Sequence, residues 1–236
     1  MTRRFYEEAS VAAKDNGFVV KLDSHELKTP AKAPLILPTE EMAQLVADDW
    51  AAQEETIDSS QMLFMRLVST AQDRVSTVID ETAEAFAAYG MSDLLCYRAD
   101  NPQRLVDRQA EAWDPLLEWA RSRYDMSFEV TTGVLPVGQP IDNEARLAAI
   151  AGRDAYRLTG LAHVSALLGS AILTLALDEA HIDAEQAYQL AFLDDLYQID
   201  EWGGDEEAEQ RLEKIALEIQ QSARYLSALS SDSGEQ

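Results

Sequence analysis

The stretch Pro34–Trp50 reads PLILPTEEMAQLVADDW, and it decides the fold class because its apolar spacing changes after Pro38. Proline cannot donate a hydrogen bond to a β-ladder, so the residues up to Pro38 favour edge or irregular β-segments. Thr39 can then cap a helix whose first turn holds two acids, where the helix dipole favours negative charge. The apolar residues at helical spacing on one face are Met42, Leu45, Val46 and Trp50.

Residues 1–38, ahead of this change, predict a small sheet of hairpins. Asp15-Asn16-Gly17 is a strong turn signal, and a short apolar strand follows it at Phe18–Leu22. Asp23-Ser24-His25 supplies a second turn. The N-terminal part is therefore expected to be β-rich.

Helical spacing dominates the remainder, apart from a glycine- and proline-containing loop at Met126–Pro140. The fold class predicted is α+β, with a small β-hairpin-rich N-terminal domain followed by a larger, mostly α-helical C-terminal domain. The expected domains are residues 1–60 and 61–229, with a disordered tail at 230–236. Beyond the first helix, which should end near Gln53–Glu55, the expected helices are one long helix from about Ser60 to Gly90, one opened by Asn101-Pro102, and Asn143–Leu158, Leu161–Ala180, Ala184–Trp202 and Asp205–Leu229.

The composition excludes several classes of protein. A net charge of −24 over 236 residues opposes binding to nucleic acid or to an anionic membrane, and it suits a basic partner or simple solubility. The longest apolar run, Val164–Leu177, is too short to span a bilayer. Cys96 is the only cysteine, which excludes an intrachain disulfide and argues against a zinc site. The start, MTRRFYEEAS, lacks the apolar core of a signal peptide.

No motif for catalysis or for a cofactor is present. The sequence lacks the phosphate-binding loop Gly-x-x-x-x-Gly-Lys and the dinucleotide fingerprint Gly-x-Gly-x-x-Gly. Carboxylates are too numerous for an acid/base pair to be identified, and the acids of Asp200–Glu209 do not have EF-hand spacing. We therefore predict no catalytic residue, no metal ligand and no cofactor.

The segment Leu193–Arg211, LDDLYQIDEWGGDEEAEQR, has the composition of a protein-docking surface. A large aromatic residue can anchor a partner, and neighbouring carboxylates can give orientation and charge selectivity. Trp202 stands at a predicted helix end before two glycines, where it can be either such an anchor or a buried hydrophobic lock. By contrast, Trp50 and Trp113 lie on apolar helical faces and are expected in the core.

Several short fragments are spread over roughly residues 3–225: Arg4-Phe5-Tyr6, Leu27-Lys28-Thr29-Pro30, Asp49-Trp50-Ala51-Ala52-Gln53, Asp93-Leu94-Leu95-Cys96-Tyr97-Arg98, Trp113-Asp114-Pro115-Leu116 and Trp202-Gly203. Together they resemble the F-type ATP synthase assembly chaperones of the Atp-twelve family. The resemblance lies in their order and spacing. One departure is Met62-Leu63-Phe64, where the family usually has Met-Pro-Leu. A second departure is that several acids near Trp202 could match the glutamate of the family, so the position of that glutamate in this chain stays open.

The resemblance implies a chaperone without enzymatic activity, monomeric when free. It would bind the free alpha subunit of ATP synthase and shield the surface that later faces the beta subunit. The bacterial branch acts in the cytoplasm, and a eukaryotic member would act in the mitochondrial matrix. The expected partner-binding residues are Glu201, Trp202, Asp205, Glu206 and Glu207, and the expected structural residues are Trp50, Gln53 and Trp113.

Two other classes of function remain open from the residues alone. A metal-dependent hydrolase could use the same carboxylates, although no nucleophile and base are paired in the sequence. A self-associating structural protein could place the apolar helix Val164–Leu177 at an interface between copies.

Overall fold

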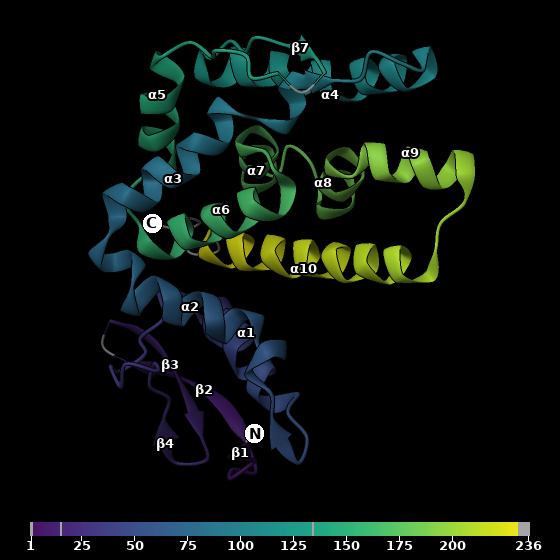
Figure 1. The fold of residues 1–236 in the computed structure, drawn as a ribbon. Helices are drawn as coiled ribbons and strands as arrows, with labels where there is room; N and C mark the ends of the chain where they lie inside the picture. Colours follow the sequence, from purple (N-terminus) through teal and green to yellow (C-terminus); the bar gives the residue numbers. More distant parts are fainter. Residues whose placement is uncertain (1, 15, 134, 231–236) are drawn as a thin grey trace. The chain divides into compact units, whose positions relative to one another are not determined.

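The computed structural model describes residues 2–14, 16–133 and 135–230, and these residues form two compact units (Figure 1). The first unit groups residues 1–79 with two distant segments, 154–160 and 224–236. The second unit consists of residues 80–153 and 161–223. The predicted α+β class is confirmed, with short strands at the N-terminus and helices afterwards. The domain boundary near residue 60 stays a prediction, and the expected tail from 231 lies outside the described residues.

The sheet of the first unit is an antiparallel meander in the order β2-β3-β4. Lys14 pairs with Gly17 at the closed end of the first hairpin, and Asp15 of the predicted turn lies outside the described residues. Gly17 has a φ of +148°, and a Cβ atom there would lie 2.4 Å from the Leu37 carbonyl oxygen. The strands are β2 (Ala9–Lys14), β3 (Gly17–Leu22) and β4 (His25–Glu26), and a separate pair joins β1 (Thr2–Arg3) to β5 (Thr56–Ile57).

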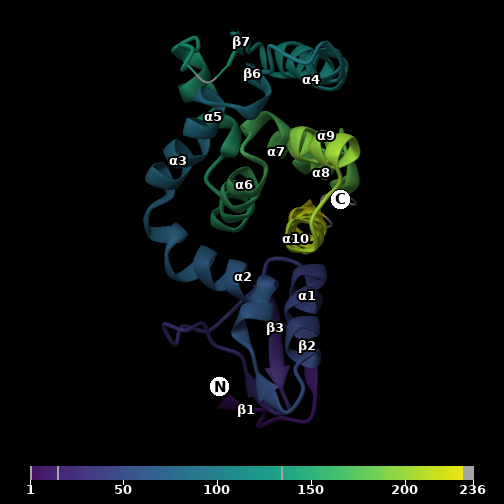
Figure 2. The ribbon, with the colours of Figure 1, turned by 45° about the vertical axis from the view of Figure 1, so that its right-hand side comes forward.

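Helix α1 (Glu40–Ala51) lies along this meander and packs on β2 and β3 (Figure 2). The apolar face predicted for it is buried at Met42, Leu45 and Val46, whereas its fourth member, Trp50, expected in the core, is only half-buried. Thr39 is its N-cap, because the Thr39 hydroxyl oxygen accepts a hydrogen bond of 3.1 Å from the Met42 amide. The same hydroxyl donates to the Ala228 carbonyl oxygen at 2.6 Å. One side chain therefore starts α1 and holds the returning C-terminal segment of the same unit.

Replacement of Thr39 by alanine is expected to lower the free energy of unfolding by about 1–2 kcal/mol, because both hydrogen bonds are lost at a buried position. Serine keeps the hydroxyl, so Thr39→Ser should retain most of the stability. Urea unfolding followed by circular dichroism gives both values. Equal stability of the alanine and serine variants would show that the hydroxyl contributes nothing.

The single long helix expected between about Ser60 and Gly90 is wrong. The structure has the 3₁₀ turn η1 (Ser59–Gln61), helix α2 (Leu63–Asp73), the 3₁₀ turn η2 (Val75–Thr77) and helix α3 (Ile79–Met91). At the break, the Ser76 hydroxyl donates to the Gln72 carbonyl oxygen and the Thr77 hydroxyl donates to the Arg74 carbonyl oxygen. Such bonds compete with the helix for backbone groups, and the β-branched side chains nearby disfavour its continuation.

Three further predicted helices are each divided in two. Gly152 at φ +73° separates α5 (Asp142–Ala151) from α6 (Ala155–Leu168), and Gly169 at φ +65° separates α6 from α7 (Ala171–Asp178). Ser170 then caps α7. A turn at Phe192 separates α8 (Ala184–Ala191) from α9 (Leu193–Trp202). Glycine adopts positive φ without strain, so each of these glycines ends a helix where the apolar spacing alone continues.

The second unit is built around α4 (Gln103–Tyr124), which packs against α7 and α9. Every residue of α7 except Asp178 is buried. Ahead of α4 lie the 3₁₀ turn η3 (Leu94–Cys96) and β6 (Tyr97–Arg98), which pairs in parallel with β7 (Thr131–Thr132). Helix α10 (Glu206–Ser230) follows α9. In the described part of the chain, none of the helices combines the length and the apolar character needed to cross a membrane.

Candidate functional site

The five predicted partner-binding residues surround the connection between α9 and α10. Trp202 is the last residue of α9, and Gly203 ends the helix at φ +82°. The Trp202 side chain is 74% exposed, which rules out the alternative of a buried hydrophobic lock. Asp205 accepts a hydrogen bond of 2.9 Å from the Ala208 amide and so starts α10. A large indole thus stands in solvent between two helix ends.

The acids of this connection fall into two groups. Glu201 forms an ion pair with Arg104 of α4, and Asp200 forms one with Arg108 at 3.1 Å. Glu206 accepts a hydrogen bond of 3.1 Å from Gln210, its neighbour one turn later. Within the described residues, neither Glu206 nor Glu207 forms an ion pair. The uncompensated charge therefore lies on α10, immediately after the indole. We call the exposed residues Trp202, Asp205, Glu206 and Glu207 the α9–α10 surface.

Arg104 and Arg108 were not predicted as partners of these acids. They lie about a hundred residues earlier in the chain, and their spacing of four on α4 is common on any solvated helix face. Because exposed ion pairs contribute only about 0–1 kcal/mol each, they can be exchanged for contacts with another protein at small cost. Within the described residues, Glu201 is the one predicted partner-binding acid that already forms an ion pair.

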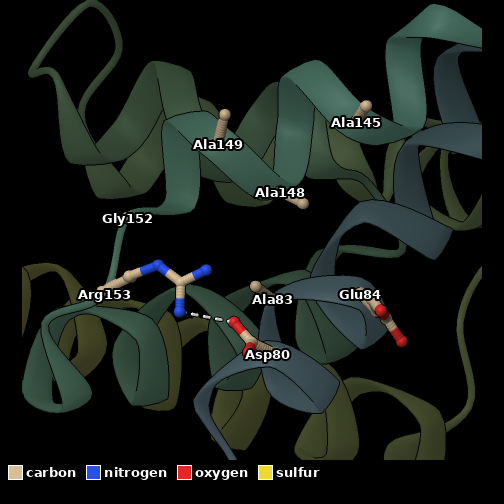
Figure 3. Close-up of a pocket in the computed structure, with 8 residues that line it drawn as sticks. All are labelled: Asp80, Ala83, Glu84, Ala145, Ala148, Ala149, Gly152 and Arg153. Carbon is tan, nitrogen blue, oxygen red and sulfur yellow. Dashed lines mark ion pairs between the residues drawn. The ribbon is translucent and has the colours of Figure 1, made fainter.

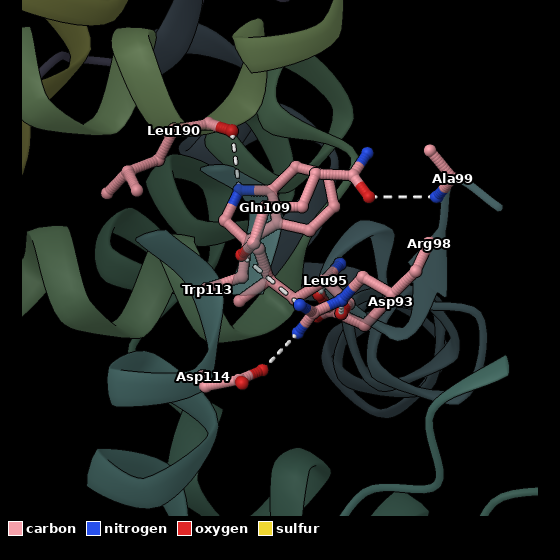
Figure 4. A network of polar contacts seen from close by, with 8 residues as sticks. All are labelled: Asp93, Leu95, Arg98, Ala99, Gln109, Trp113, Asp114 and Leu190. Atoms are coloured by element: carbon pink, nitrogen blue, oxygen red, sulfur yellow. Dashed lines mark hydrogen bonds and ion pairs between the residues drawn. The ribbon is translucent and has the colours of Figure 1, made fainter. Parts of the chain in front are cut away.

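A polar network on α4 holds α8, as Figure 4 shows, and also holds α9 through Asp194. The Gln109 side chain accepts a hydrogen bond of 2.8 Å from the Ala99 amide and donates one of 2.7 Å to Asp194. The Trp113 indole donates to the Leu190 carbonyl oxygen at 3.0 Å. These bonds hold the N-terminal half of α9 and so position Trp202 at its other end.

Arg98 completes the network from β6. Its guanidinium donates to the carbonyl oxygens of Leu95 (2.8 Å) and Gln109 (3.2 Å) and pairs with Asp114 at 2.9 Å. It also lies over the Trp113 ring, 5.1 Å from the centroid. A buried charge with all of its main donors satisfied is tolerated, whereas an unpaired one is costly. Arg98 itself is buried, and only its ion-pair partner Asp114 reaches solvent, so the arrangement holds β6 against α4.

A buried carboxylate, Asp93, joins η3 to α7. It accepts hydrogen bonds from the Leu95 amide (3.1 Å), the Ser170 hydroxyl (2.7 Å) and the Ile172 amide (3.1 Å). Burial raises the pKa of Asp93 to about 6, although the donors oppose that shift. Carboxylates accept bonds well at helix N-termini, where backbone amides lack partners within the helix.

The predicted structural residues Trp50 and Gln53 lie in the first unit. The Tyr6 hydroxyl donates to the Trp50 carbonyl oxygen at 2.6 Å, and the two rings meet edge to face with centroids 5.6 Å apart. The Gln53 side chain donates to the Asp49 carbonyl oxygen at 3.0 Å and accepts from the Asp58 amide at 2.7 Å. Both residues therefore close the C-terminal end of α1.

An open groove of about 720 Å³ lies between α3 and α5 in the second unit (Figure 3). Alanines line it, and an ion pair of 2.6 Å between Asp80 and Arg153 stands at one end. The groove offers volume but few groups that could orient a small ligand. In the parts of the chain that are described, no three histidine, cysteine or acidic side chains are placed to share a metal ion.

Comparison with known proteins identifies similar chains. The model of the family described as ATP12 chaperone protein matches residues 3–121. A curated relative, the mitochondrial protein atp12 of Schizosaccharomyces pombe, is 22% identical over 220 residues, which cover 87% of this chain and 75% of that protein. The crystal structure of Atp12 from Paracoccus denitrificans is 38% identical with a TM-score of 0.89, covering 97% of this chain and 98% of that one. A putative chaperone from Agrobacterium tumefaciens is 37% identical with a TM-score of 0.90, covering 96% and 86%.

Proposed function

This chain belongs to the ATP12 chaperone protein family, and from that premise we propose that it assists assembly of the catalytic sector of F-type ATP synthase. It binds the free alpha subunit and shields the interface of that subunit until the alpha/beta hexamer forms. It acts without catalysing a reaction, as a monomer, in the bacterial cytoplasm or, in a eukaryote, in the mitochondrial matrix. The observation that carries the proposal is the exposed Trp202 beside uncompensated acids.

The α9–α10 surface suits a contact that must later be released. Trp202 covers apolar surface on the alpha subunit, and Glu206 and Glu207 pair with basic side chains around it. Asp205 contributes charge while it starts α10, and Glu201 can exchange Arg104 for a partner's base. Because exposed charges steer association and set its rate more than its strength, such an interface forms quickly and stays moderate in affinity.

Reversal of charge at Glu206 and Glu207 is expected to weaken capture of the alpha subunit about tenfold or more at low salt, because two attractive contacts become repulsive. The variant is Glu206→Lys/Glu207→Lys, and the dissociation constant for purified alpha subunit is measured by biolayer interferometry at 50 and 500 mM NaCl. The difference from wild type should shrink at high salt, since ions screen exposed charges.

Glu54→Lys/Glu55→Lys is the matched control. It changes the net charge by the same amount at two adjacent exposed acids of the first unit. Equal weakening by both variants would mean that only the total charge matters. Unchanged binding by the folded Glu206→Lys/Glu207→Lys variant would remove the acids of α10 from the interface.

A further inference from the structure

We infer that the exposed apolar side chains of Val130, Leu135 and Ile141 form a second docking contact, which covers an apolar patch of the same client protein. We call these three residues the apolar contact. The inference rests on the proposed function and deepens it, because it adds a place where the client is held. The residues belong to the segment that connects α4 with α5 and contains β7 (Figure 1).

The exposure of these side chains is concentrated in one short segment. Val130 is 45% exposed, Leu135 76% and Ile141 82%. Among the described residues, only three other large hydrophobic side chains are comparably exposed: Phe5, Trp202 and Leu217. Single exposed apolar residues are normal on a protein surface, but several within one segment indicate an interaction site.

The sequence of this segment differs from the rest of the surface. Residues 130–141 contain no charged side chain, although 26% of the whole chain is charged. Pro136 and Pro140 restrict the backbone at both ends of residues 136–140. The absence of charge does not improve the solubility of a loop. It is typical of a surface that a partner covers, because charged residues are depleted in the core of an interface.

The base of the segment is held in a defined conformation. The Gln139 side chain accepts a hydrogen bond from the Glu129 amide and donates one to the Glu129 carbonyl oxygen, both at 2.9 Å. The buried Asn143 side chain donates to the Ser127 carbonyl oxygen at 2.8 Å. The Gly133 amide donates to the Arg98 carbonyl oxygen at 2.9 Å and so extends the pairing of β6 with β7. A loop fixed in advance loses less conformational entropy when a partner binds it.

Charge around the apolar contact identifies the occupant. Glu129, Asp142 and Glu144 lie at the two ends of the segment and are exposed. Two bases near the segment already have acidic partners: Arg146 is paired with Asp125 at 2.8 Å, and Arg98, on the strand beside β7, is paired with Asp114 at 2.9 Å. A second copy of this chain or an anionic membrane would bring negative charge against these acids, which is repulsive. A client with an apolar patch bordered by bases fits, and the α9–α10 surface requires the same chemistry.

The test replaces two side chains of the apolar contact and measures binding of purified alpha subunit. The variant Leu135→Ser/Ile141→Ser is expected to weaken the dissociation constant by about tenfold, as for loss of a buried apolar anchor. The weakening should be the same at 50 and 500 mM NaCl, because apolar contact is not screened. Gln139→Ala frees the base of the segment and should weaken binding by a smaller factor. The matched control Leu217→Ser, on α10, should have no effect.

The possible outcomes separate the two proposals. If wild type binds the alpha subunit and the Leu135→Ser/Ile141→Ser variant, folded by circular dichroism, binds equally well, the apolar contact is overturned and the proposed function stands. If wild type does not bind the alpha subunit, both are overturned. If light scattering shows a wild-type dimer that the double variant dissolves, the occupant is a second copy and the inference fails in favour of self-association. A salt-dependent loss would assign the effect to charge and would also overturn the inference.

Discussion

The Asp93→Ala variant is expected to lose about 3–4 kcal/mol of its free energy of unfolding. Alanine leaves the Ser170 hydroxyl and the amides of Leu95 and Ile172 without their acceptor in a fully buried site. Each unsatisfied buried donor costs about 1–3 kcal/mol, and removal of the carboxyl adds a small cavity. Urea unfolding followed by circular dichroism gives the value.

The loss should depend on pH in a defined direction. Because burial raises the pKa of Asp93 to about 6, above the ordinary value of 3.8, the folded state holds a proton between those values and the unfolded state does not. The stability from this group is therefore fully present below about pH 3.8 and falls as the pH rises through about 6. The difference between wild type and Asp93→Ala should be larger at pH 5 than at pH 7.5.

An exposed capping aspartate provides the control for Asp93. Asp183 caps α8 by accepting a hydrogen bond of 2.8 Å from the Gln186 amide in a solvated position. Asp183→Ala should cost about 1 kcal/mol, as for a typical N-cap. Similar losses for the two variants would show that the burial of Asp93 is not important. A loss for Asp93→Ala that grows as the pH rises from 5 to 7.5 would contradict the direction of its pKa shift.

Local signals in the sequence were sufficient for the N-terminal half of the first unit. Thr39 caps α1, and Asp23-Ser24 forms the turn between β3 and β4. Both the cap and the turn depend only on neighbours within a few residues. The joining of residues 154–160 and 224–236 to the same unit could not be foreseen. It depends on contacts such as the hydrogen bond of 3.0 Å from the Tyr225 hydroxyl to the Tyr156 carbonyl oxygen, which link distant parts of the chain.

Helix length was overestimated for a related reason. Apolar spacing continues across Gly152 and Gly169, so the pattern predicts continuous helices there. The breaks arise from backbone conformation at the two glycines and from the acceptors that receive the next helix start. Asp93 is one of those acceptors for α7, and it lies 79 residues before Ile172. A capping partner so distant in the chain leaves no local signal.

The candidate site shows the same division. An indole at a helix end followed by acids was predicted as a group, because the residues are consecutive. The exposure of that indole was left open by the sequence and comes from the structure. The bases on α4 that form ion pairs with Asp200 and Glu201 were not predicted. Likewise, the apolar side chains of residues 130–141 are only a loop composition in the sequence, and their significance comes from their exposure.

The Trp113→Ala variant should lose about 3–5 kcal/mol of its free energy of unfolding, which is the usual cost of removing a buried tryptophan from a core. Trp113 is 1% exposed, donates a hydrogen bond to the Leu190 carbonyl oxygen and supports the Arg98 guanidinium on its ring. Alanine removes all three interactions and leaves a cavity between α4 and α8. Urea unfolding followed by circular dichroism measures the loss without relying on tryptophan fluorescence.

Trp202→Ala is the matched control, since it removes the same side chain from a site 74% exposed to solvent. It should change the free energy of unfolding by less than about 0.5 kcal/mol, as for most surface substitutions. If Trp202 anchors the alpha subunit, the same variant should weaken binding about thirtyfold, which corresponds to about 2 kcal/mol. Trp113→Ala, at a temperature where it remains folded, should change binding only as far as it loosens α9. If Trp202→Ala is unstable, this indole belongs to the fold. If the variant is stable and binds as tightly as wild type, the indole has neither role. In either case the acids beside it would lack the apolar centre that a docking surface needs.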